Sequence, residues 1–367
     1  MPTFSLIMRP ITFYFIIVIL SSVVFVDCAQ SSKRSRKPVT LIQIGPKHNN
    51  YHVGDQLSIN LQTKIKDGYL KSVELFLDGK SLFVSSKTDC DFEIETSKFE
   101  VGIHILKTIA TKEDGVSGDN FIEFLILSDI TPETLGYKVN NIYPHNIQYF
   151  TEGFEIRQGF LYEGTGQEGT SAIYKTDLSN WKLVNEYKLD KQYFGEGITI
   201  INDKLYQLTY KTQIGFVRNL KTFELIKTWN YKNAQGWGLT NDGKSIIMSD
   251  GTDYIYFIDP ETLNVSRRIQ VCNQKGTVSN LNELEYINGE IWSNIWTTDT
   301  IVKIDPKNGK ILAEIDFTGL LDSALTNRKT NVDVFNGIAY DNQTHKIYVT
   351  GKLWPKIFEI EIIKKSK

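Results

Sequence analysis

The chain contains few cysteines and prolines and no excess of charge of either sign. Among its 367 residues are 3 Cys and 9 Pro, and 41 Lys and Arg are balanced by 43 Asp and Glu. Without a Cys-X-X-Cys pair or a Cys/His cluster, the sequence predicts neither a zinc site nor a disulfide framework, and no metal ligands are expected. The net charge of −2 argues against a surface for nucleic acid or another polyanion. The many Tyr and Phe residues, 18 and 20, instead favour a β-rich globular protein.

A largely apolar run, from Ile11 to Val26, lies near the N-terminus. It is shorter than the roughly 20 residues of a membrane span and suits the apolar region of a signal peptide. We therefore predict a signal peptide over residues 1–29, a linker over residues 30–37, and an exported protein, periplasmic or otherwise outside the cytoplasm. Cys28 lies just after this run, so a membrane anchor through a lipid on Cys28, as in bacterial lipoproteins, stays open beside a soluble form.

Residues 38–128 have the pattern of a small β-sandwich. Apolar and polar residues alternate from Leu57 to Leu61, and Asp78-Gly79 is a typical two-residue hairpin turn. The predicted strands are Thr40–Ile44, Gln56–Leu61, Val73–Leu77, Ser81–Val84, Asp91–Ile94, Gly102–Ala110 and Asn120–Leu127. About seven strands in about 90 residues are typical of an immunoglobulin-like sandwich. The segment has no cluster of titratable residues, so we expect a spacer or docking module.

From residue 129 onward an internal repeat indicates a β-propeller. A polar residue, usually followed by Gly and then by an apolar residue, recurs as Glu152-Gly153-Phe154, Glu196-Gly197-Ile198, Gln235-Gly236-Trp237, Asn282-Glu283-Leu284 and Asn336-Gly337-Ile338. Further short apolar segments follow these copies, so each repeat of about 45 residues has the four strands of a propeller blade.

The last repeat reaches the end of the chain after three strands. The segment from Gly136 to Asn140, just before the first copy, is expected to supply the missing strand and close the ring, because closure removes exposed sheet edges. The sequence thus predicts an all-β protein: a five-bladed β-propeller over residues 129–367, preceded by the immunoglobulin-like β-sandwich.

The repeated motif is expected to open the innermost strand of each blade, so its side chains should meet at one mouth of the central channel. The residues expected there are Glu152, Glu196, Trp237, Asn282 and Glu283, joined by Trp296 and Lys352. Each alone has a plainer explanation, such as a turn, packing between blades or a solvated lysine. Carboxylates, an amide, a lysine and indoles around one cavity are together typical of an active site.

Seven motifs carry a family resemblance. They are Tyr149-Phe150-Thr151-Glu152-Gly153, Phe194-Gly195-Glu196-Gly197-Ile198-Thr199, Gly236-Trp237-Gly238-Leu239-Thr240, Leu281-Asn282-Glu283-Leu284-Glu285-Tyr286, Asn294-Ile295-Trp296, Asn336-Gly337-Ile338-Ala339-Tyr340-Asp341 and Thr350-Gly351-Lys352-Leu353-Trp354-Pro355. In this order, over roughly residues 134–363, they resemble the glutamine cyclotransferases of the plant and bacterial type. The sandwich lies outside the resemblance.

This resemblance implies an enzyme that converts the N-terminal glutamine of a peptide or protein to pyroglutamate and releases ammonia. The implied site consists of Phe150, Glu152, Glu196, Trp237, Asn282, Trp296 and Lys352. From their chemistry we assign Glu196, Asn282 and Lys352 to catalysis, and Phe150, Glu152, Tyr210, Trp237 and Trp296 to substrate binding. Glu196 would carry the proton of the amine to the departing ammonia, while Lys352 and Asn282 would hold the amide oxygen. The family often has Trp at the position of Tyr210 and Glu at that of Gln235; we expect the first change to reshape the substrate wall and the second to tune the channel.

No cofactor is required by this chemistry, while a structural calcium ion in the channel stays open, and we expect a monomer. A calcium-dependent propeller lactonase or esterase is one alternative, but it needs several oxygen ligands around a metal, which Lys352 and the indoles fit poorly. A non-catalytic binding propeller is the other, and it would have no reason to gather Glu196, Asn282 and Lys352 at one mouth.

Overall fold

The structure is a computed structural model that describes residues 34–47, 50–324 and 331–365. Within these ranges the elements are strands, apart from the short 3-10 helices Thr96–Lys98 and Asp322–Ala324, so the predicted all-β fold is confirmed. The predicted signal peptide and Cys28 lie outside the described residues. In the part of the chain that is described, no helix has the length and apolar character needed to cross a membrane.

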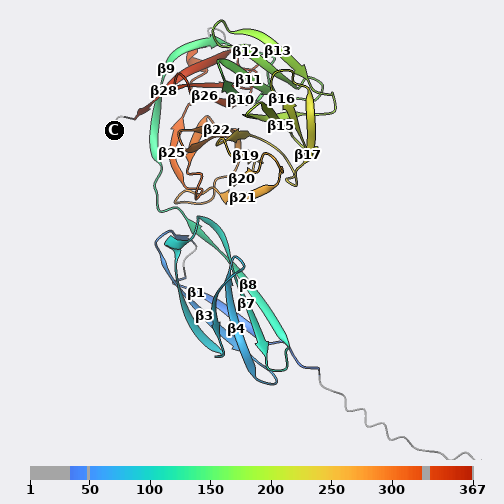
Figure 1. Ribbon diagram of the computed structural model, residues 1–367. Helices are drawn as coiled ribbons and strands as arrows, with labels where there is room; N and C mark the ends of the chain where they lie inside the picture. The colour runs from blue at the N-terminus through green and yellow to red at the C-terminus, as the bar shows by residue number, and fades with distance from the viewer. Residues whose placement is uncertain (1–33, 48–49, 325–330, 366–367) are drawn as a thin grey trace, which may run out of the picture.

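The N-terminal part consists of two packed sheets (Figure 1). One sheet has the order β1 (Val39–Gly45), β3 (Gln56–Lys64), β6 (Asp89–Glu95). The other has the order β2 (Tyr51–His52), β8 (Ser117–Leu127), β7 (Gly102–Lys112), β4 (Leu70–Leu77), β5 (Lys80–Ser85). All the predicted strands are present, and β2 is additional because two residues are too few to show an alternating pattern.

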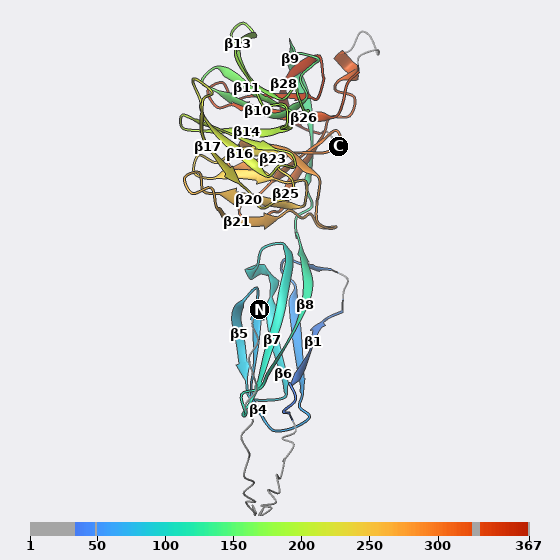
Figure 2. The same ribbon diagram turned by 90° about the vertical axis from the view of Figure 1, so that its right-hand side faces the viewer.

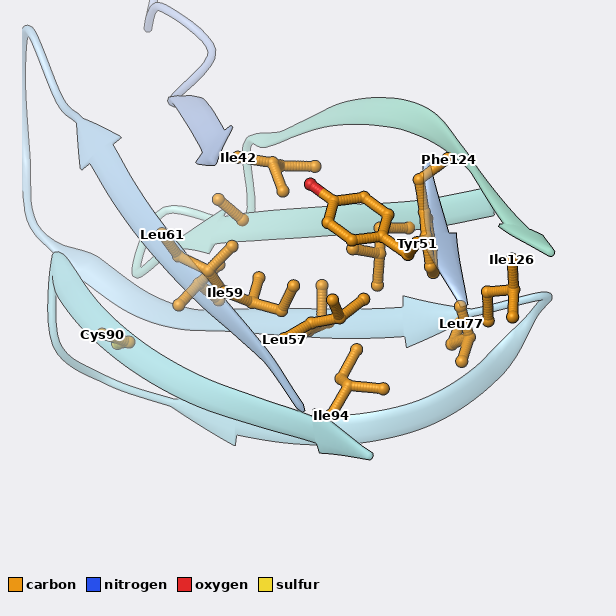
Figure 3. Packing of buried hydrophobic residues seen from close by; sticks show 14 residues of the cluster. Ile42, Tyr51, Leu57, Ile59, Leu61, Leu77, Cys90, Ile94, Phe124 and Ile126 are labelled. Carbon is orange, nitrogen blue, oxygen red and sulfur yellow. The ribbon is translucent and has the colours of Figure 1, made fainter. Parts of the chain in front are cut away.

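The core of this part follows from the alternation of its strands. Leu57, Ile59 and Leu61 of β3 are fully buried, and Figure 3 shows them pointing into the same space as Ile94 of β6. The predicted turn between β4 and β5 is also present. Asp78 and Gly79 have φ angles of 50° and 82°, the left-handed values that a two-residue hairpin of this kind requires.

The rest of the chain forms four-stranded units around a common centre (Figure 1). Unit I comprises β10 (Thr151–Arg157), β11 (Phe160–Thr165), β12 (Ala172–Asp177) and β13 (Lys182–Lys188), and unit II comprises β14 (Gly195–Ile201), β15 (Lys204–Thr209), β16 (Ile214–Asn219) and β17 (Leu225–Asn230). Unit III comprises β18 (Leu239–Asn241), β19 (Ile246–Ser249), β20 (Tyr254–Ile258) and β21 (Val265–Gln270), and unit IV comprises β22 (Leu281–Ile287), β23 (Glu290–Ile295), β24 (Thr300–Ile304) and β25 (Ile311–Asp316). Unit V comprises β26 (Phe335–Asp341), β27 (Lys346–Gly351), β28 (Lys356–Lys364) and, from before unit I, β9 (Glu133–Pro144).

Strand β9 closes the ring. It pairs with β28 in antiparallel fashion along residues 135–144, and its first residues pair in parallel with β25 of unit IV. The predicted closing strand at residues 136–140 is therefore confirmed. The first strands of the units also neighbour one another in a closed cycle, β10, β14, β18, β22, β26 and back to β10.

The glycines of the repeated motif let these first strands approach closely. A Cβ on Gly153 would lie 2.4 Å from the backbone N of Ile198 in unit II, and one on Gly197 would lie 2.5 Å from the backbone N of Leu239 in unit III. Such distances exclude any side chain, so the Gly of the motif reflects backbone contact between neighbouring units.

The two parts of the chain meet at the edge of units III and IV (Figure 2). Val101 and Leu127 of the N-terminal part pack with Cys272, which is buried and free, as is Cys90. Around this apolar contact, the backbone N of Ile103 donates to the side chain of Gln270 at 2.8 Å. The junction thus lies at the outer strands of the ring.

Candidate active site

A cavity of about 200 Å³ opens where the first strands begin. It is lined by Phe150, Glu152, Phe194, Glu196, Tyr210, Trp237, Asn282, Trp296, Asp333 and Lys352. All eight residues proposed from the sequence for catalysis or substrate binding are in this set. The structure therefore brings together side chains from distant parts of the chain, such as Glu152 and Lys352, which are 200 positions apart.

An irregularity at the start of the first strands aims the polar side chains inward. Glu152, Glu196 and Asn282 are each the second residue of β10, β14 and β22. At these places the pairing register shifts between Thr151 and Gly153, between Gly195 and Ile198, and between Leu281 and Leu284. A β-bulge of this kind turns a side chain away from the regular alternation, which here directs it to the mouth of the ring.

The floor of the cavity holds a buried charged group. Lys352 Nζ donates to Glu152 Oε1 at 2.6 Å, and the two side chains are 7% and 2% exposed. Asn336 Nδ2 lies 3.4 Å from the other oxygen of Glu152. Glu196 lies close enough to Glu152 for the charge of one carboxyl to shift the pKa of the other, so the two carboxyls and the lysine form one connected group.

The two carboxyls of this group differ in their affinity for a proton. Burial raises the pKa of Glu196 well above its usual value, and the negative charge of Glu152 raises it further. Burial also raises the pKa of Glu152, but the ammonium of Lys352 opposes this effect. Of the two carboxyls, Glu196 is therefore the one that binds a proton more readily.

Aromatic rings form the walls. Trp237 and Trp296 meet edge to face, with ring centres 5.5 Å apart at 76°. Trp237 Nε1 donates to Gln235 Oε1 at 2.8 Å, so Gln235 holds this ring in place. Tyr210 lies in the wall as expected, with its ring 5.5 Å from that of Phe194.

Glu283 does not belong to the cavity, and the expectation that placed it there is wrong. Its carboxylate is fully buried and accepts the backbone N–H groups of Phe154 in unit I and Ile338 in unit V, at 3.1 and 2.8 Å. Because it follows Asn282 directly in the strand, it points to the opposite side. Its role is to join three neighbouring first strands.

Two residues of the cavity were missed in the sequence. Phe194 stands two positions before Glu196, as Phe150 stands two positions before Glu152, so the repeat itself carried this signal. Asp333 lies in a loop just before β26, outside the repeated motif, and nothing in the sequence marked it.

His145 and Glu163 form a buried ion pair close to the site. His145 Nδ1 lies 2.7 Å from the carbonyl O of Trp354, and its Nε2 lies 2.9 Å from Glu163 Oε1. Both partners are acceptors, so the two ring nitrogens must both donate and the imidazole is protonated. Burial alone would lower the pKa of His145, but the adjacent Glu163 carboxylate and the Trp354 carbonyl together outweigh burial and raise it. Thr151, next to Glu152, donates to the same Glu163 oxygen at 2.7 Å.

The described residues contain no group of three or more His, Cys, Asp or Glu side chains arranged to hold a metal ion. The chemistry that the cavity offers is that of its own groups: a carboxyl with a raised pKa, a carboxylate paired with an ammonium, an amide and two indoles. Such a set can move a proton and stabilise a developing negative charge.

Comparisons with known proteins agree with this part of the chain. The model of the glutamine cyclotransferase family matches residues 119–362. A glutaminyl-peptide cyclotransferase of Arabidopsis thaliana is 38% identical over 234 residues, which cover 62% of this chain and 73% of that protein. The crystal structure of a glutaminyl cyclase from Myxococcus xanthus is similar with a TM-score of 0.58 and 30% identity, and the match covers 64% of this chain and 100% of that chain.

Proposed function

This chain belongs to the glutamine cyclotransferase family and is a glutaminyl-peptide cyclotransferase, and we propose that the cavity at the start of its first strands is the active site. The reaction closes the N-terminal glutamine of a peptide into pyroglutamate. The α-amine nitrogen forms a bond to the side-chain carboxamide carbon, the bond from that carbon to the amide nitrogen breaks, and the nitrogen leaves as ammonia. The observation that carries the proposal is the buried group of Glu196, Glu152 and Lys352 between two indoles.

Glu196 is the proton carrier in this proposal. The attacking amine must lose one proton and the departing nitrogen must gain one. Since the raised pKa of Glu196 lets it bind a proton readily, it can give a proton to the departing nitrogen and take one from the amine, which leaves it unchanged at the end. A raised pKa suits a carboxyl to both steps near neutral pH. The α-amine, with a pKa of about 7.7–8.0, needs no strong base to become neutral.

Lys352 and Asn282 stabilise the negative charge that develops on the carboxamide oxygen. Lys352 is held by Glu152, so its ammonium is in place before the substrate binds and need not reorganise during the reaction. Glu152 is positioned to receive the substrate's α-amino group. Phe150, Tyr210, Trp237 and Trp296 surround the methylene groups of the glutamine.

The finer features of the protein belong to the same proposal. We assign the ring of four-stranded units as a five-bladed β-propeller over residues 129–367 and the two-sheet part over residues 38–128 as an immunoglobulin-like sandwich. The closed cycle of first strands and the two packed sheets support these assignments. The enzyme class is an acyltransferase of the aminoacyl type. The protein is an exported monomer that requires no cofactor, and its membrane contact is limited to a lipid anchor at Cys28 if one is attached.

The test is an assay of ammonia release from a peptide that begins with glutamine, with mass spectrometry of the product. The expected product has lost the mass of one ammonia molecule. N-acetylglutamine is the control, because its acetylated nitrogen is not nucleophilic, and it should remain unchanged. Absence of ammonia release from the glutamine peptide at high enzyme concentration would overturn the proposal. Hydrolysis of a lactone or ester by the same preparation would favour the lactonase alternative.

A further inference from the structure

A second cavity, of about 390 Å³, adjoins the active site on the side of unit III. The two cavities share Tyr210, Trp237 and Trp296. The other walls of the second cavity are Ala234, Gln235, Asp250, Gly251, Thr252 and Asn280. Because the same three rings border both spaces, a chain that leaves the active site past these rings enters the second cavity directly.

The reaction decides which part of a peptide lies in each space. Both reacting groups, the α-amine and the carboxamide, belong to the first residue and must reach Glu196 and Lys352, which are 5% and 6% exposed at the floor. The carboxyl side of that residue therefore points toward the opening, and the second residue lies outside. A third cavity, of about 190 Å³ beside units IV and V, shares one wall residue, Asp333, with the active site. The three shared rings make the cavity at unit III the continuous path.

Trp237 of the shared wall is held in position on two sides. Gln235 Oε1 accepts the hydrogen bond of Trp237 Nε1, and Gly251 lies against the same indole, since a Cβ there would come within 2.6 Å of the ring. Trp296 is 41% exposed, a high value for an indole, and its edge-to-face contact with Trp237 leaves part of its surface open. An aromatic ring that is already held in position can bind a flat apolar group with little loss of its own side-chain freedom.

Asp250 carries the negative charge of this cavity, and its carboxylate already accepts hydrogen bonds from neighbouring residues. Asp250 accepts hydrogen bonds from Asn233 Nδ2 at 2.7 Å, from the backbone N of Thr252 at 3.1 Å and from Thr252 Oγ1 at 2.5 Å. The bonds from Thr252 close the turn of Asp250 and the bond from Asn233 comes from the loop after β17, so both oxygens are occupied. Its charge still repels an acidic group placed nearby.

We propose that the cavity beside unit III binds the second residue of the peptide substrate and selects a large uncharged side chain there, aromatic side chains above all. The inference rests on the proposed function. It adds a specificity site formed by residues outside the group that performs the chemistry.

The experiment compares kcat/KM for glutaminyl-phenylalaninamide, glutaminyl-glycinamide and glutaminyl-glutamate amide. Burial of a phenyl ring against indoles should make the first substrate better than the second by about tenfold, and the third should be the poorest. Ala234→Trp should fill the cavity, and the ratio of phenylalanine to glycine substrate should then fall to near one. Ala234 is exposed and lies outside any strand, and thermal unfolding checks that the variant is folded.

Asp322→Trp, which adds similar bulk beside units IV and V, is the matched control and should keep the tenfold ratio. The inference is overturned if the wild type does not distinguish the substrates, if Ala234→Trp keeps the ratio, or if Asp322→Trp removes it. A wild type that cyclises none of these substrates and no glutaminamide would instead refute the proposed function, so the two failures are distinguishable.

Discussion

Replacing Lys352 with Met should destabilise the fold as well as slow the reaction. The ammonium of Lys352 lies 2.6 Å from Glu152, whose side chain is 2% exposed. Met retains most of the aliphatic chain, so the main change is a buried carboxylate without its opposing charge. Removing one partner of such a pair typically destabilises a protein by about 3–5 kcal/mol.

The double variant Glu152→Gln/Lys352→Met separates the lost charge pair from lost packing. It removes both charges, so no unpaired buried charge remains, and it should regain most of the stability that Lys352→Met loses. The free energy of unfolding from urea titration at pH 7 is the measurement. Both variants should lose kcat by about 10²–10³-fold, because neither has the ammonium that stabilises the developing oxyanion.

The pH dependence of Lys352→Met gives a second readout. Burial already raises the pKa of Glu152, and loss of the ammonium, which opposes that shift, should raise it further. A carboxyl with a higher pKa in the folded than in the unfolded protein stabilises the fold while protonated. The variant should therefore be closest to the wild type below the unfolded-state pKa of about 4.3 and lose stability as the pH rises through the folded-state value. If the free energy of unfolding of Lys352→Met at pH 7 lies within about 1 kcal/mol of the wild-type value, the reasoning about the buried pair is refuted.

The remaining predictions address the proton carrier, the wall, the supporting ion pair and metals. Glu196→Gln keeps the size of the side chain but cannot carry a proton, so kcat should fall by about 10²–10⁴-fold; retention of more than about a tenth in steady-state assays would contradict the role. Trp296→Ala should mainly raise KM, since the indole contacts the substrate equally in the ground state and in the transition state. A decrease in kcat with KM unchanged would argue against a role of Trp296 in substrate binding. His145 has a raised pKa in the folded protein, so the stability it contributes should be complete below about pH 6.5 and disappear as the pH rises through the folded value; His145→Gln should flatten this part of the stability profile. Activity should survive exhaustive chelation, because no proposed step uses a Lewis acid; a loss restored only by zinc would show different chemistry.

Much of the fold was predictable because it follows from local patterns. The alternation in Leu57 to Leu61 places one face of β3 in the core, and Asp78-Gly79 makes a turn that few other pairs can make. The repeated polar-Gly-apolar motif marks the first strands of units I and II, since only Gly allows the backbone contact seen at Gly153 and Gly197. Closure by β9 was predictable as well, because the last unit lacked a strand.

The members of the candidate site were predictable, but not their interactions. The motif places Glu152, Glu196 and Asn282 at equivalent positions, so the ring brings them to one mouth. Nothing in the sequence showed that Lys352 pairs with Glu152, because that contact depends on how the first and last units meet. Glu283 was misplaced for a related reason. Consecutive residues of a strand point to opposite sides, and the sequence motif does not tell whether Asn282 or Glu283 faces the cavity.

The sequence by itself determined the all-β class, the repeat, the closing strand and the residue types that meet at the mouth. The class follows from local alternation of apolar and polar residues, and the other features follow from the motif repeated along the chain. Tertiary structure alone decided which carboxyl binds a proton more readily. That choice depends on burial and on the distance between charges far apart in the chain, here Glu152, Glu196 and Lys352. It also decided the places of Asp333 and of the His145–Glu163 pair, since a loop residue and a buried histidine acquire their roles only from the segments that surround them.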